Sequence, residues 1–121
     1  MKKASVERLR AYGSVCRTAQ GVKLAFDGLV ASDIHGLTEK FRLFQQLRAL
    51  ERELELVEQA LQTLDPVQRK ILQMLDIDPK KGNCARLCDM LGREPATIYR
   101  WRDKALSKVG QVFFHDSIPQ K

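Results

Sequence analysis

The sequence predicts an all-α protein: a hairpin or coiled coil of long helices, followed by a C-terminal helix-turn-helix. Two observations support this fold class. Apolar residues recur at spacings of three and four along most of the chain, and no segment alternates apolar and polar residues with a period of two. We expect a helical segment at 1–63, a helix-turn-helix domain at 64–110 and a tail at 111–121.

The first expected helix covers about residues 4–26 and has one apolar stripe. The stripe consists of Val6, Leu9, Tyr12, Cys16, Ala19, Val22 and Phe26. A break follows between Gly28 and Gly36, where Ser32 and Asp33 also favour a turn over the interior of a helix.

The second expected helix covers about residues 37–63 and has a heptad seam. The seam residues are Leu43, Leu47, Leu50, Leu54, Val57, Leu61 and Leu64. Such a narrow seam packs on another helix, either the first helix folded back as an antiparallel hairpin or the same helix of a second subunit. The second alternative predicts a homodimer through 43–64.

Three shorter helices are expected after residue 64. Asp65 can cap a helix that begins at Pro66 and runs to about residue 76. Its buried face should hold Val67, Ile71, Leu72 and Leu75. A polar loop at 78–83 and a helix at about 84–91 should follow, then a turn at Gly92 and a helix at about 95–109, with a frayed tail from His115.

The segment from Cys84 to Asp103 has the pattern of a helix-turn-helix. Gly92 stands where the turn needs a left-handed backbone, and Glu94 can cap the following helix. Small Cys88 suits the closest approach of the two helices. The apolar residues expected to face inward are Leu87, Leu91, Ile98, Trp101 and Ala105. The alternative is an ordinary helical hairpin that binds no DNA.

With those residues buried, the outward face of the last helix would hold Ala96, Tyr99, Arg100 and Asp103. Arg100 is the candidate for a bidentate contact to guanine in the major groove. The candidates for phosphate contacts are Arg93, Thr97, Arg102, Lys104 and Lys108. Residues 80–110 contain eight basic side chains against three acidic ones, within a chain of net charge +6, and this favours double-stranded DNA as the partner over a merely solvated basic face.

Other classes of function fit the sequence less well. Cys84 and Cys88 lie one helical turn apart, but His35 and His115 have no potential ligands near them, so we expect no zinc site. The acidic side chains of residues 51–58 are expected to form the solvated side of a helix. We therefore expect no enzyme activity and no cofactor. We also expect no signal peptide and no membrane span, and a cytoplasmic location.

Residues 64–110 resemble region four of bacterial sigma factors. The matching residues are Leu64-Asp65-Pro66, Arg69, Ile71, Leu72, Leu87, Leu91-Gly92, Thr97-Ile98-Tyr99-Arg100 and Lys104-Ala105-Leu106. The chain departs from that pattern at Arg86 and Pro95. The resemblance implies DNA binding by residues 64–110, with RNA polymerase as a further candidate partner.

The layout of the whole chain is similar to small phage transcriptional regulators of the ArpU and RinA type. This similarity implies a sequence-specific regulator encoded by a phage or prophage. Two alternatives remain open: a phage terminase small subunit that binds DNA for packaging, and an interaction protein that docks on RNA polymerase without DNA.

Overall fold

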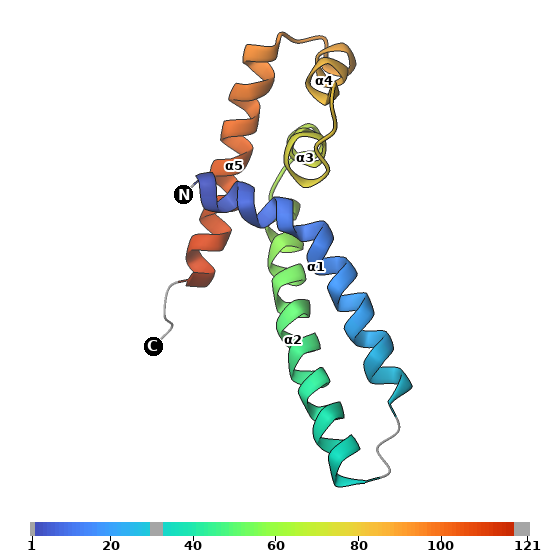
Figure 1. The fold of residues 1–121 in the computed structure, drawn as a ribbon. Coiled ribbons are helices and arrows are strands. Elements are labelled where there is room, and N and C mark those ends of the chain that lie inside the picture. Colours follow the sequence, from blue (N-terminus) through green and yellow to red (C-terminus); the bar gives the residue numbers. More distant parts are fainter. Residues whose placement is uncertain (1, 30–32, 118–121) are drawn as a thin grey trace. The chain divides into compact units, whose positions relative to one another are not determined.

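The computed structural model describes residues 2–29 and 33–117, and within them the chain is all-α (Figure 1). The helices are α1 Lys2–Gly28, α2 Ile34–Gln62, α3 Pro66–Leu72, the π-helix η1 Gln73–Ile77, α4 Asn83–Leu91 and α5 Pro95–Ser117. No strand is found in these ranges. The all-α class predicted from the sequence is confirmed.

Most helix ends lie within three residues of the expected positions, because local signals set them. The Asp65 carboxylate accepts a hydrogen bond from the Gln68 backbone nitrogen at 2.7 Å, and the Gln68 side chain accepts one from the Asp65 nitrogen. This capping box satisfies two backbone donors that the first turn of α3 would otherwise leave free. At the start of α2, the Asp33 carboxylate accepts a hydrogen bond from the Gly36 nitrogen in the same way. Ser32 and residues 118–121 of the expected tail lie outside the described residues.

The chain divides by its internal contacts into two compact units. Unit 1 contains Met1–Gly13 and Leu56–Lys121, and unit 2 contains Ser14–Glu55. This division does not coincide with the expected boundary between residues 63 and 64. The reason is that the beginning of α1 and the end of α2 contribute to the same core as the later helices.

The main core of unit 1 joins residues that are far apart in the sequence. Leu9 of α1 and Val57 of α2 are fully buried in one cluster with Leu72 of α3 and Val109 of α5. The same cluster continues along α5 to Phe113. Burial of these side chains, at about 1.5–3 kcal/mol each, ties the N-terminal segment to the C-terminal helices.

Helix α5 is longer than expected, since it continues past Val109 and His115 to Ser117. The expected tail at 111–121 is therefore helical as far as residue 117. Gly110 lies inside this helix, where a Cβ atom would come within 3.3 Å of the Ser5 hydroxyl oxygen. Its missing side chain allows α1 to approach α5 closely, and burial of Phe113 keeps the helix continuous beyond the glycine.

The expected burial of α3 is wrong at one position. Ile71 and Leu72 are fully buried, but Val67 is exposed. Val67 is the second residue of the helix. It lies beside an open hollow that is also lined by Asp65, Gln68, Trp101 and Lys104.

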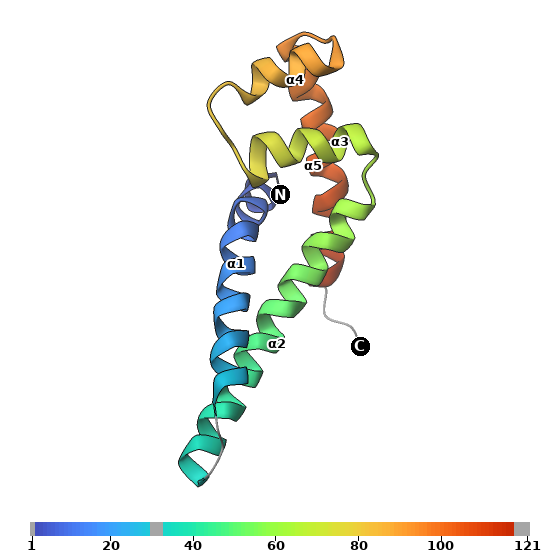
Figure 2. The same ribbon diagram turned by 90° about the vertical axis from the view of Figure 1, so that its right-hand side faces the viewer.

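Unit 2 consists of the later part of α1 and the earlier part of α2. These segments lie side by side and run in opposite directions (Figures 1 and 2). Ala19 and Leu43 are buried, and the Phe26 and Phe44 rings lie 6.1 Å apart between their centroids. The Lys40 ammonium lies 4.8 Å from the centre of the Phe26 ring.

Candidate nucleic-acid interface

Two helices and a sharp turn form the candidate interface in unit 1. Gly92 ends α4 with φ 63° and ψ 36°, a left-handed backbone that only glycine enters cheaply. The Arg93 nitrogen donates to the Cys88 carbonyl at 3.2 Å and closes the turn. Helix α5 then begins at Pro95, and the Thr97 nitrogen donates to the backbone carbonyl of Glu94.

A small apolar core holds α4 and α5 together. Its fully buried members are Ile71 of α3, Leu87 of α4 and Ile98 of α5. The half-buried side chains packed against it are Met74, Leu75, Cys88, Leu91 and Trp101. The inward residues are therefore those expected from the sequence, and they orient the remaining faces of α5.

The first turns of α5 present a face to solvent. Ala96, Tyr99, Arg100 and Asp103 are all exposed, in agreement with the face expected from the sequence. Thr97 is half-buried, and its hydroxyl oxygen accepts a hydrogen bond from Arg100 Nη2 at 3.2 Å. This contact holds the guanidinium against its own helix with other donors still accessible.

Tyr99 links this face to α4. A hydrogen bond between the Tyr99 hydroxyl and the Cys84 thiol raises the pKa of Tyr99, so the phenol stays neutral at physiological pH. Burial, together with the nearby Cys84, raises the pKa of the Cys88 thiol. Both cysteines are half-buried.

Arg102 forms an ion pair with a buried carboxylate. Its Nε atom donates to Asp76 Oδ2 at 2.9 Å, and its Nη2 atom lies 2.5 Å from Asp76 Oδ1. Asp76 is fully buried and the Arg102 side chain is 22% exposed. The hydrogen bond with Asp76 raises the pKa of Arg102. Arg102 is therefore a partner of a buried carboxylate, and its expected contact with phosphate stays a prediction.

The π-helix η1 places Asp76 for this ion pair. The Asp78 nitrogen donates to the Gln73 carbonyl at 2.9 Å, five residues back, so the turn holds an extra residue. Asp76 is not among the residues predicted from the sequence. A signal was present, because Arg102 follows Ile98 by four residues and so shares its inward face.

A second buried polar residue, Asn83, was also missed because the loop was expected to include it. Its amide nitrogen donates to the Met74 carbonyl at 2.7 Å, and its amide oxygen accepts from Arg86 Nη1 at 2.7 Å. Asn83 thus joins η1 to the beginning of α4.

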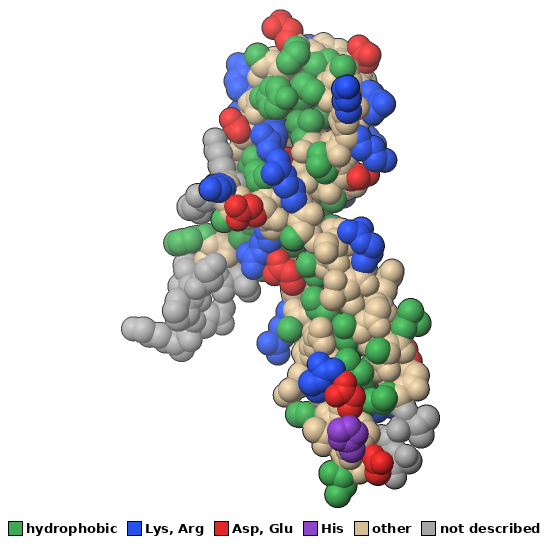
Figure 3. Space-filling model, in the orientation of Figure 1, with side chains coloured by type: hydrophobic (Ala, Val, Ile, Leu, Met, Phe, Trp, Pro, Cys, Tyr) green, Lys and Arg blue, Asp and Glu red, His purple; other side chains and the backbone are tan. Residues whose placement is uncertain are grey.

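The other basic candidates lie around the exposed face. Arg93 and Lys104 are exposed, and the Arg93 guanidinium lies 5.9 Å from the centre of the Trp101 ring. Lys108 is exposed and donates to Gln68 Oε1 at 3.1 Å. Lys and Arg side chains are spread around this part of the molecule, with hydrophobic side chains between them (Figure 3).

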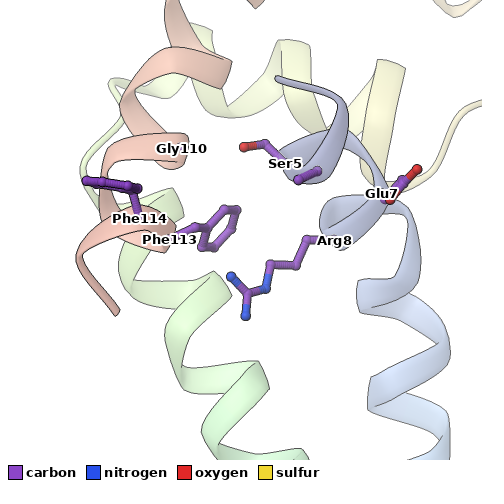
Figure 4. Close-up of a pocket in the computed structure, with 7 residues that line it drawn as sticks. Ser5, Glu7, Arg8, Gly110, Phe113 and Phe114 are labelled. Atoms are coloured by element: carbon purple, nitrogen blue, oxygen red, sulfur yellow. The ribbon is translucent and has the colours of Figure 1, made fainter. Parts of the chain in front are cut away.

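A hollow of about 460 Å³ lies elsewhere in unit 1, between the beginning of α1 and the end of α5. In Figure 4 the Arg8 side chain extends toward the Phe113 ring, and the Ser5 hydroxyl is directed toward Gly110. The Arg8 guanidinium lies 4.7 Å from the centre of the Phe113 ring. These contacts pack α1 on α5, and we assign the hollow no part in DNA binding.

The described residues include no cluster of three or more His, Cys, Asp or Glu side chains that could hold a metal ion. In the same part of the chain, no helix combines the length and the apolar character needed to cross a lipid bilayer. Comparisons with protein-family models, curated proteins and solved structures found no match.

Proposed function

We propose that this chain is a sequence-specific double-stranded-DNA-binding protein that regulates transcription. The observation that carries the proposal is the exposed face of α5, where Tyr99, Arg100 and Asp103 project on the side opposite the buried Ile98. A helix that packs on one side and presents polar side chains on the other can enter the major groove with its first turns.

The arrangement of α4 and α5 supports this proposal. A helix-turn-helix needs a short first helix, a turn with a left-handed residue and a second helix packed across the first. Helix α4 has nine residues, Gly92 has φ 63°, and Leu87 packs against Ile98. The resemblance of residues 64–110 to sigma region four supports a role in transcription, and the similarity to phage regulators supports a phage or prophage origin.

In this proposal the side chains divide into two groups. Arg100 donates two parallel hydrogen bonds to O6 and N7 of a guanine, after giving up its contact with Thr97. The phosphate contacts come from Arg93, Lys104 and Lys108, which lie around that face and fix the register of the helix. Arg102 is left out of this group because two of its donors are held by the buried carboxylate of Asp76 and it is less exposed than the other three.

The test compares three arginine or lysine variants on two duplexes. A preferred duplex is first selected from a pool of random sequences, and a scrambled duplex serves as the nonspecific target. Arg100→Ala should weaken binding to the preferred duplex by about 1–3 kcal/mol and binding to the scrambled duplex much less. Lys104→Ala should weaken both alike and lower the salt slope by about one unit. Arg17→Ala removes an exposed charge in unit 2 and is the matched control.

Two results would contradict the proposal. Equal losses for Arg100→Ala on the two duplexes would remove the assignment of α5 as the recognition helix. An absence of duplex binding at low salt would contradict DNA binding itself. Separate measurements test the two remaining alternatives. A terminase small subunit would assemble as a ring, and light scattering would give a correspondingly large mass. A docking protein would bind RNA polymerase in a binding assay that contains no DNA.

A further inference from the structure

Unit 2 has a group of large apolar side chains that are exposed at the end of α1 and the beginning of α2. Their exposed fractions are 74% for Leu24, 84% for Ile34, 61% for Leu37, 61% for Phe41 and 45% for Phe44. Figure 3 shows hydrophobic side chains at this end of the hairpin-like unit. A single exposed apolar residue needs no explanation, but five close together on one small unit do.

Four of these residues form a stripe along α2. Ile34, Leu37, Phe41 and Phe44 follow one another at steps of three, four and three, which is the spacing of a helix–helix seam. Leu43 is buried within the chain and lies on the other side of the helix. Helix α2 therefore has a covered apolar face and, opposite it, an uncovered one.

One end of the uncovered stripe, Phe44, is held in place by a contact inside unit 2. The Phe44 ring packs against Phe26 at 6.1 Å, and the Lys40 ammonium both covers the Phe26 ring and donates to the Leu29 carbonyl at 3.4 Å. A side chain that is already held in this way loses little entropy when a partner covers it.

The exposed area matches the size of a small protein interface. With roughly 200 Å² for each fully exposed side chain of this size, the four residues of the stripe expose on the order of 500 Å². That value lies within the range of the largest apolar patches on monomers. Two copies would together bury about 1,000 Å², the smallest area expected of a biological interface and typical of a weak, transient one.

We propose that this stripe, Ile34 to Phe44 of α2, is the interface for a second copy of this chain, paired antiparallel. In a two-fold pair the same stripe serves both copies. Antiparallel pairing brings Leu37 of one copy to Phe41 of the other, and Ile34 to Phe44, so each aliphatic side chain meets a ring. Parallel pairing would instead stack Arg48, the next residue of the stripe, on Arg48 of the second copy, and like charges at that position repel.

This interface differs from the seam at 43–64 that the sequence suggested for a dimer. Leu43, Val57 and Leu64 of that seam are buried within a single chain, so they are not available to a second copy. The inference goes beyond the proposed function and does not depend on it, because it concerns a different unit and is tested without DNA.

The first experiment measures the mass of the full chain by sedimentation and light scattering from about 1 to 100 μM, a range that suits the weak affinity of a small interface. The wild type should change from 13.8 kDa to twice that mass as its concentration rises. The double variant Leu37→Gln/Phe41→Gln should stay monomeric with an unchanged circular dichroism spectrum, because both side chains are exposed in the monomer. Phe114→Gln, an exposed phenylalanine of unit 1, should still dimerise.

The second experiment tests the direction of pairing. Leu37→Lys and Phe41→Glu should each be monomeric, and their equimolar mixture should recover a dimer, because antiparallel pairing places the new ammonium beside the new carboxylate. Parallel pairing predicts no recovery. A wild type that stays monomeric at 100 μM, or a double Gln variant that still dimerises, would overturn the proposal. So would binding of the wild type to phosphatidylcholine–phosphatidylglycerol vesicles that the double Gln variant loses, since the stripe would then be a membrane contact.

Discussion

The Asp76–Arg102 ion pair should be the polar contact in unit 1 whose disruption costs the most stability. Arg102→Ala would leave the carboxylate of Asp76 without its partner at a fully buried position. Breaking such a pair by removing one member typically costs about 3–5 kcal/mol. The Arg102 side chain is 22% exposed, so some water can reach the site, and we expect a loss near 3 kcal/mol. For a chain of 121 residues, that is a large part of a total of about 6–18 kcal/mol.

The assay is urea unfolding followed by circular dichroism. Arg100→Ala is the matched control, because it removes the same side chain two residues earlier on the same helix from an exposed position. We expect that control to change the free energy of unfolding by less than about 0.5 kcal/mol. The free energy of unfolding of the double variant Asp76→Leu/Arg102→Met should fall by much less than either single variant suggests, since the double variant leaves no buried charge.

The reasoning would be refuted if Arg102→Ala lost less than about 1 kcal/mol, or no more than Arg100→Ala. Additive losses in the double variant would also contradict it, because two residues in direct contact should show a coupling energy.

Three further predictions concern single positions. Gly92→Ala should destabilise the protein by about 1–2 kcal/mol, because φ is 63° at this position. Gly21→Ala should stabilise it by about 0.5–1 kcal/mol, because Gly21 lies inside α1 with open space around it. Equal melting temperatures for the two variants would contradict this prediction. Asp65→Ala should cost about 0.5–2 kcal/mol through loss of the capping box, and urea unfolding would detect it. The hydrogen bond with Cys84 raises the pKa of Tyr99 in the folded protein. The stability that this hydrogen bond contributes is therefore complete below the ordinary pKa of tyrosine, about 10, and is lost as the pH rises through the pKa of Tyr99 in the folded protein. Titration of phenolate absorbance should show a pKa above 10 that falls in Cys84→Ala; an unchanged value would remove Cys84 as the cause.

The helices themselves could be predicted because their signals are local. Apolar spacing set the lengths of α1 and α2, and the Asp65-Pro66 pair set the beginning of α3. Gly92 marked the turn because no other residue type enters that backbone region at low cost. Once these elements were known, helical periodicity alone placed Tyr99 and Arg100 on the outward face of α5.

The end of α5 could not be predicted, since no local signal explains why a helix continues through Gly110. The cause lies about a hundred residues away, where Ser5 and Leu9 of α1 meet α5. The same contacts explain why the compact units do not follow the order of the sequence. A stripe of apolar residues shows that a helix has a partner, but it does not show which segment that partner is.

The sequence by itself therefore determined the all-α class, most helix ends and the outward face of α5, because each depends on residues within one or two turns. The tertiary structure decided which charged side chains are free. Helical spacing separates Arg100 on the outward face from Arg102 on the face of Ile98, but only the structure places a buried carboxylate, 26 residues away, against Arg102. Whether a charged group is solvated or paired depends on which groups the fold brings within a few ångströms of it, because the interaction between two charges weakens with distance. The sequence does not give those distances.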